Sequence, residues 1–121
     1  MSTTTNPMFQ FASPEVLSKL ATIKPYVILV LTKGENYGLS ETPRIIQSEH
    51  LPYVLQQRED NIMILTMPIM DNNTNLAAVA VYNTTDKEKV QQLVDKDPAI
   101  QAGVFDYEIV TGMGLPGDQL V

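Results

Sequence analysis

Apolar runs along the chain alternate with segments in which apolar residues recur at helical spacing, and this alternation predicts the order of strands and helices. The β-branched, apolar run at 26–34 predicts the first strand. Thr42 and Pro43 then open a helix that continues to about Arg58. A shorter helix is predicted at about 14–22, because a serine cap and a proline stand at its start.

The second half of the chain predicts a hairpin, a helix and a last strand. The apolar runs at 61–70 and 76–83 are separated by turn-forming residues at 71–75, which favour an antiparallel hairpin. A helix is predicted at about 86–94 and a strand at 104–112. The resulting order, βαββαβ, indicates an α+β domain of the ferredoxin-like type with a four-stranded antiparallel sheet.

Both faces of this sheet are predicted to be mostly apolar, except near the last strand, where Asp106 and Glu108 make one side partly polar. Met63, Leu65 and Met67 would share one face of the second strand, with Ile62 and Ile64 on the other, and the first and third strands follow the same pattern. Helices cover one face of such a sheet. We expect the helix-free face to pack against the same face of a second copy, giving a homodimer. The alternative is that the N-terminal helix or the C-terminal tail covers this face within one chain.

Length, charge and residue usage exclude several classes of function. A chain of 121 residues fits one domain, which we expect at 26–112, after an extension with a short helix at 1–25 and before a tail at 113–121. The net charge of −6, with scattered basic residues, argues against a nucleic-acid partner.

The chain has no cysteine and one histidine, which argues against a structural metal site. The glycines after the first strand lack the Lys-Ser/Thr of a phosphate-binding loop, and no cofactor is expected. With neither a signal-peptide pattern nor an apolar run of about 20 residues, we expect a cytoplasmic protein without a membrane partner.

The single histidine, His50, lies in the middle of an apolar helical face. On a helical wheel it falls beside Ile46 and Val54, so it should point at the sheet. It is either a core histidine bonded to a carbonyl or an imidazole that acts as general acid or base at an apolar pocket. Asp97, before Pro98, is the best candidate partner. The Asp97 carboxylate could cap a following helical turn, or it could orient the imidazole, and spacing alone leaves both alternatives open.

Two separated motifs carry a resemblance to a known family. "QSEHLPYV" lies on the predicted helix, and "DPAIQAGVFDYEIV" leads into the last strand. Over roughly residues 26–111 the chain resembles the YCII-related (YciI-like) domain, in which a helix carries His followed by Leu, and Asp-Pro precedes Ala-Gly-Val. The resemblance implies a dimeric α+β barrel and a His-Asp dyad in a cleft, formed here by His50 and Asp97.

The resemblance also implies an enzyme that acts on a small molecule such as a lactone-like or halogenated organic acid, since relatives with an assigned reaction are dehalogenases of chlorinated muconolactones. Tyr53 and Arg44 are expected to bind the ligand, although a tyrosine at a helix edge and a solvated arginine are the structural alternatives. Met67, where relatives have a glycine, is expected to line and narrow the cleft. The alternative function is a non-catalytic dimeric module that binds a small ligand, or only itself, with His50 and Asp97 as a structural pair.

Overall fold

The computed structural model describes residues 7–121, and the chain divides into two units: residues 25–112, and a unit formed by the two ends of the chain. The terminal unit contains the short helices η1 (Pro7–Phe9) and α1 (Pro14–Lys19). The Ser13 hydroxyl accepts a hydrogen bond from the Val16 N–H at 3.2 Å and caps α1, as the sequence predicts. Within residues 7–121 no helix combines the length and the apolar character needed to cross a membrane.

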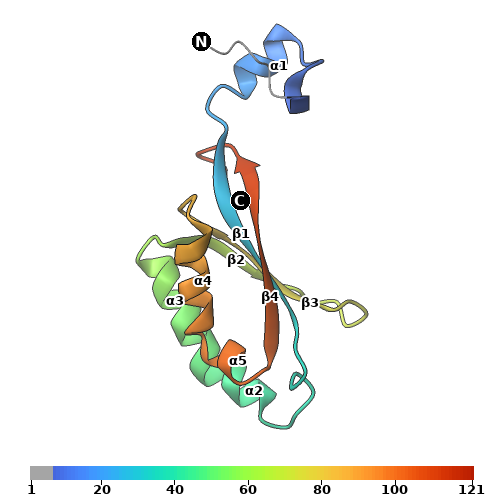
Figure 1. Ribbon diagram of the computed structural model, residues 1–121, viewed down its shortest axis with the longest axis vertical. Coiled ribbons are helices and arrows are strands. Elements are labelled where there is room, and N and C mark those ends of the chain that lie inside the picture. The colour runs from blue at the N-terminus through green and yellow to red at the C-terminus, as the bar shows by residue number, and fades with distance from the viewer. Residues whose placement is uncertain (1–6) are drawn as a thin grey trace. The chain divides into compact units, whose positions relative to one another are not determined.

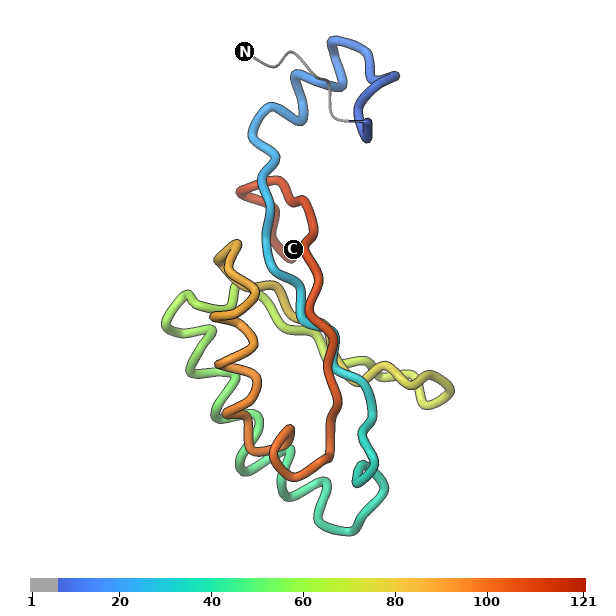
Figure 2. Tube along the Cα trace, in the orientation of Figure 1, coloured from blue at the N-terminus to red at the C-terminus, as the bar shows by residue number. Residues whose placement is uncertain are grey.

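The larger unit has the βαββαβ order predicted from the sequence. Its elements are β1 (Lys24–Lys33), α2 (Thr42–Ile45), η2 (Ile46–His50), α3 (Leu51–Glu59), β2 (Met63–Pro68), β3 (Leu76–Tyr82), α4 (Lys87–Asp95), α5 (Pro98–Gln101) and β4 (Phe105–Gly114). The strands form one four-stranded sheet in the order β2-β3-β1-β4, in which β3 pairs antiparallel with both β2 and β1. Helices α2 to α5 lie together on one side of the sheet (Figure 1), and the β2–β3 turn projects away from them (Figure 2). The predicted α+β, ferredoxin-like fold is confirmed.

The hydrophobic core lies between these helices and one face of the sheet. Val27 and Leu29 of β1 pair with Tyr82 and Ala80 of β3, and all four side chains are buried. The helices and the start of β4 contribute further buried residues: Val54, Val90, Val94, Ala99, Val104 and Phe105. Because side chains of paired residues point to the same face, alternate residues of each strand point away from the helices.

A β-bulge in β2 changes the face to which its residues point. The register shifts between Met63 and Leu65, so Met63 faces the helices, whereas Leu65 and Met67 pair with Val81 and Val79 on the opposite face. The prediction that Met63, Leu65 and Met67 share one face is therefore wrong, because strict alternation fails where a strand contains an extra residue.

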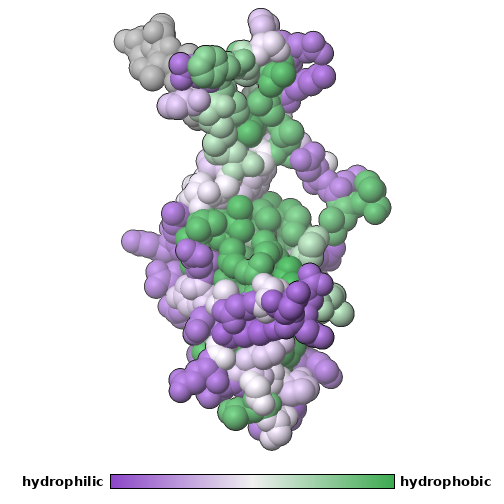
Figure 3. All heavy atoms as spheres, turned by 90° about the vertical axis from the view of Figure 1, so that its right-hand side faces the viewer, coloured by the Kyte–Doolittle hydropathy of each residue, from purple (hydrophilic) through white to green (hydrophobic). Residues whose placement is uncertain are grey.

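The helix-free face of the sheet carries an apolar patch. It extends across β2, β3 and β1, and its residues, which we call the helix-free patch, are Ile28, Val30, Leu65, Met67, Val79 and Val81. Figure 3 looks onto this side of the molecule and shows hydrophobic side chains gathered over the sheet. Met67 is 44% exposed, so the patch is open to contact in one chain.

Elements α2, η2 and α3 form one continuous helical segment whose hydrogen bonding changes midway. In the π-helical turn η2, the Leu51 N–H donates to the Ile46 carbonyl, five residues back. Pro52 follows at once and has no N–H to donate. The segment thus accommodates its proline with a wider turn, a rare feature that is frequent at functional sites.

Candidate functional site

The side chains of His50 and Asp97 are in direct contact with each other. His50 ends η2, and Asp97 stands immediately before α5. The His50 Nδ1 and Asp97 Oδ2 atoms lie 2.6 Å apart, and the two residues are only 6% and 4% exposed. An ionised carboxylate can only accept a hydrogen bond, so this contact keeps the proton of a neutral imidazole on Nδ1 and leaves the lone pair on Nε2.

Asp97 makes a second contact with its other oxygen. Oδ1 accepts a hydrogen bond from the Ala99 N–H at 2.9 Å and caps α5. Capping the helix and holding the imidazole, which spacing alone leaves as alternatives, are thus performed together by one carboxylate. No third ligand turns the pair into a metal centre, since within residues 7–121 no group of three His, Asp or Glu side chains is placed to hold an ion.

An aromatic row leads from the loop after β1 to the imidazole. The Phe105 ring meets the His50 ring edge-on, with centroids 5.1 Å apart and an interplanar angle of 66°. Phe105 also contacts Tyr37, with ring centroids 6.1 Å apart. Phe105 itself is buried at the start of β4. The imidazole is therefore held by a carboxylate at Nδ1 and by an aromatic ring against its side.

Two tyrosines near the pair are kept neutral by their surroundings. The Tyr53 hydroxyl donates to the Leu93 carbonyl at 2.6 Å, and the Tyr82 hydroxyl donates to Gln57 Oε1 at 3.0 Å. Burial, and then the negative charge of Asp97, raises the pKa of Tyr53. Burial raises the pKa of Tyr82 further, with smaller contributions from Tyr53 and Asp97. Both hydroxyls thus remain hydrogen-bond donors at neutral pH, while the buried Gln57 Nε2 has no partner among the described residues.

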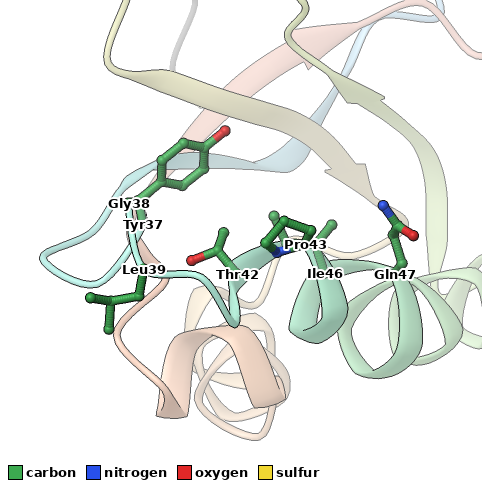
Figure 4. A pocket seen from close by; sticks show the side chains of 7 residues that line it. All are labelled: Tyr37, Gly38, Leu39, Thr42, Pro43, Ile46 and Gln47. Atoms are coloured by element: carbon green, nitrogen blue, oxygen red, sulfur yellow. The ribbon is translucent and has the colours of Figure 1, made fainter.

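A pocket of about 440 Å³ opens at the start of the same helical segment. It is lined by Tyr37, Gly38, Leu39, Thr42, Pro43, Ile46 and Gln47 (Figure 4). The Tyr37 ring and the Gln47 amide stand at opposite ends of the hollow, with Pro43 and Ile46 between them. Ile46 lies about one helical turn before His50, so the pocket adjoins the His50–Asp97 pair, although His50 is not among its lining residues.

The loop that forms one wall of the pocket is anchored to the turn before β4. The Asn36 side-chain amide donates to the Ala102 carbonyl at 2.9 Å, and the Thr42 hydroxyl donates to the Asn36 carbonyl at 2.9 Å. Gly34 passes so close to this turn that an added Cβ would lie 2.4 Å from the Gly103 carbonyl oxygen. These contacts hold the loop after β1 against the start of β4, which explains why the Tyr37 ring contacts the Phe105 ring.

The other residues predicted to bind a ligand do not line this pocket. Arg44 is exposed, with Nε 2.7 Å from Glu41 Oε2 and Nη1 2.9 Å from Glu49 Oε2. The Tyr53 hydroxyl is bonded to the backbone of α4. Met67 belongs to the helix-free patch, on the face of the sheet opposite the helices. The structure therefore brings His50 and Asp97 together and leaves these three side chains elsewhere.

The pocket residues Tyr37, Thr42 and Gln47 are not predicted from the sequence. The local pattern places Tyr37 in a loop and Thr42 at a helix start, and it gives no sign that these residues or Gln47 line a pocket. The available signal is the close approach of two chain segments, which requires a glycine at position 34 and a glycine at position 103, where φ is +73°. A glycine can indicate that another segment of the backbone comes close, but it does not identify that segment.

Comparison with known proteins supports the fold. The sequence matches no protein-family model and no curated protein at a significant level. Among solved structures, the chain is similar to 5-chloro-2-hydroxyhydroquinone dehydrochlorinase from Burkholderia phenoliruptrix AC1100, in complex with 2,5-dihydroxybenzoquinone. The identity is 18%, the TM-score is 0.50, and the match covers 71% of this chain and 90% of that one. At this identity the likeness is one of fold.

Proposed function

We propose that this protein is an enzyme that transfers a proton to or from a small organic molecule, with His50 as general acid or base and Asp97 as the residue that orients it. The observation that carries the proposal is the buried 2.6 Å contact between His50 Nδ1 and Asp97 Oδ2 beside a pocket. A carboxylate at Nδ1 fixes the tautomer in which Nε2 can accept a proton. Removal of a proton from carbon, followed by loss of a leaving group such as halide, is a reaction that suits this arrangement.

We also propose that the chain belongs to the YCII-related domain family. The two motifs around His50 and Asp97, and the ferredoxin-like fold shared with a dehydrochlorinase, support this assignment. The solved dehydrochlorinase holds a quinone, which is a small ring with oxygen substituents. For this chain we propose a substrate of comparable size and leave the reacting group to be found by screening halogenated and lactone-like organic acids.

The proposal can be tested before a substrate is known, because the chain has one histidine. Imidazole ¹⁵N shifts report directly which ring nitrogen carries the proton. We expect Nδ1–H in the wild type and Nε2–H in Asp97→Asn, since an asparagine amide can donate to Nδ1. An Nε2–H tautomer in the wild type would overturn the proposed orientation of His50.

The catalytic step is tested by turnover. Once the screen yields a compound that the wild type converts, His50→Asn and Asp97→Asn are compared with it. Loss of a general base typically lowers the rate by 10²–10⁴-fold, and a mis-set tautomer should also reduce it strongly. Equal turnover by His50→Asn for every active compound would exclude the acid–base role.

We propose that the protein forms a homodimer through the helix-free patch. The side chains of the patch are apolar although no helix of the unit covers them, and burying them against a second copy would remove them from water. Val79→Glu should convert a dimer to monomers in light scattering, whereas Gln92→Glu adds the same charge on the exposed surface of α4 and should not. A monomeric wild type would refute this proposal.

One observation favours the second candidate, a non-catalytic dimeric module with His50 and Asp97 as a structural pair. His50 does not line the pocket, and Phe105 packs against its ring. In that case His50→Asn would lower stability and change no binding or turnover.

A further inference from the structure

We propose that the pocket beside the His50–Asp97 pair binds a planar organic anion about the size of a substituted six-membered ring, recognised by Lys33, Tyr37 and Gln47. That this anion is the substrate rests on the function proposed above; that the pocket binds it does not. A cavity of about 440 Å³ lies within the range of small-molecule sites, about 300–1,000 Å³.

The pocket combines apolar walls with two uncommitted polar groups. Leu39, Pro43 and Ile46 supply apolar surface. The Tyr37 hydroxyl and the Gln47 amide make no hydrogen bond to another residue within the part of the chain that the structure describes. Small-molecule sites are typically apolar with a few such convergent groups, which fix the orientation of the ligand.

The charged side chains near the pocket favour a negatively charged ligand. Lys33 Nζ lies 5.4 Å from the centroid of the Tyr37 ring and forms no ion pair with a carboxylate of the described residues. Arg44, the other cation near the start of the helical segment, is neutralised by Glu41 and Glu49. In a chain with a net charge of −6, an ammonium that lies over a pocket-lining ring and has no carboxylate partner is a local positive site.

The aromatic ring that borders the pocket favours a flat molecule. The Tyr37 ring bounds one end and is held in place by the Phe105 ring and by Lys33. An aromatic face packs well on another planar group and less well on a puckered ring. A planar anion lying against Tyr37 could thus reach the Gln47 amide with one oxygen substituent.

Three probes separate these features. Benzoate is planar and negatively charged, benzamide is planar and neutral, and cyclohexanecarboxylate is charged and puckered. Each is titrated into the full ¹⁵N-labelled chain while the Gly38 and Leu39 backbone amides and the Gln47 side-chain amide are followed by NMR. We expect saturable shifts with benzoate and at least about fivefold weaker binding of the other two. No saturable shift with benzoate, or equal affinity for the three probes, would overturn the inference.

Variants assign the recognition to residues. Lys33→Gln should weaken benzoate binding about fivefold, whereas Lys87→Gln, the same charge change on the exposed start of α4, should leave it unchanged. Gln47→Leu should also weaken it. Unaltered affinity in Lys33→Gln would remove the charge argument and with it the proposal.

Ligand binding by the pocket can be tested independently of the proposed acid–base reaction. His50→Asn leaves every pocket residue in place and should bind benzoate as the wild type does, even where it abolishes turnover. Absence of benzoate binding with a normal Nδ1–H tautomer would refute the pocket assignment alone, and the reverse result would refute the acid–base proposal alone.

Discussion

Replacing Asp97 by alanine should reduce the free energy of unfolding far more than the same change at Asp86, although both residues cap a helix. Asp86 Oδ1 accepts from the Glu88 and Lys89 N–H groups at 3.0 and 3.2 Å on the exposed start of α4. Asp97 uses Oδ1 for the cap of α5 and Oδ2 for His50, and it is buried. The comparison therefore isolates the cost of the second, buried contact.

The two costs differ in size. Loss of an N-cap costs about 1 kcal/mol at either position. At Asp97 the change also leaves the buried His50 Nδ1–H without an acceptor, which adds about 1–3 kcal/mol. Removing the carboxylate relieves its own desolvation, so the sum should stay below the roughly 3–5 kcal/mol seen when one partner of a buried ion pair is removed and a charge is stranded. We expect about 2–4 kcal/mol for Asp97→Ala and about 1 kcal/mol for Asp86→Ala.

Urea unfolding at pH 7 measures the difference, at one protein concentration because dimer stability depends on concentration. The slope of free energy against urea should be unchanged, so that midpoints report stability. Asp97→Ser retains a cap but has too short a side chain to reach the imidazole, and it should fall between the wild type and Asp97→Ala. Equal losses for Asp97→Ala and Asp86→Ala would show that the contact with His50 contributes nothing to stability.

Three further predictions concern the framework of the site. Gly34→Ala should lower stability by about 2 kcal/mol or more in urea unfolding, because its Cβ would lie 2.4 Å from a backbone oxygen, whereas Gly38→Ala meets nothing within 4 Å and should be near neutral; equal effects would contradict the close approach. Burial raises the pKa of Tyr82, so the unfolded chain ionises first, near pH 10, and stability present below that pH should fall by about 1.4 kcal/mol per pH unit above it. Tyr82→Phe should make this alkaline decline shallower, and an unchanged decline would assign it to other groups. Tyr53→Phe removes a hydrogen bond to the backbone of α4 and should cost about 1 kcal/mol without changing benzoate binding; weaker binding would instead place this hydroxyl in the site.

Most of the fold follows from local patterns in the sequence. The caps at Ser13, Asp86 and Asp97 act within three residues of their own position, so helix starts can be predicted without knowledge of the partner elements. The βαββαβ order follows from changes in hydrophobic period in the same way. The bulge between Met63 and Leu65 does not, because the extra residue is defined only by pairing with β3.

The candidate site is likewise predictable only where it depends on local sequence. The helical wheel predicts that His50 points into the core, since that depends on one helix. Its contact with Asp97 joins residues 47 positions apart, and the residues alone identify Asp97 as a candidate without deciding its role. The pocket depends on the loop after β1 returning to the turn before β4 through Asn36, a contact between segments 66 residues apart, and no local pattern identifies these two segments as partners.

The two proposed functions differ in whether a ligand must reach the imidazole of His50. Asp97 holds His50 at Nδ1 and at the same time caps α5, so the carboxylate cannot leave the ring without disturbing the helix, and chemistry must take place at Nε2. Phe105 fills the space at the side of the imidazole and contacts Tyr37 at the edge of the pocket. Tyr37 lines the pocket, whereas Phe105 and His50 do not. The acid–base role requires a ligand in the pocket to come within reach of His50 Nε2, whereas a structural pair requires no such access.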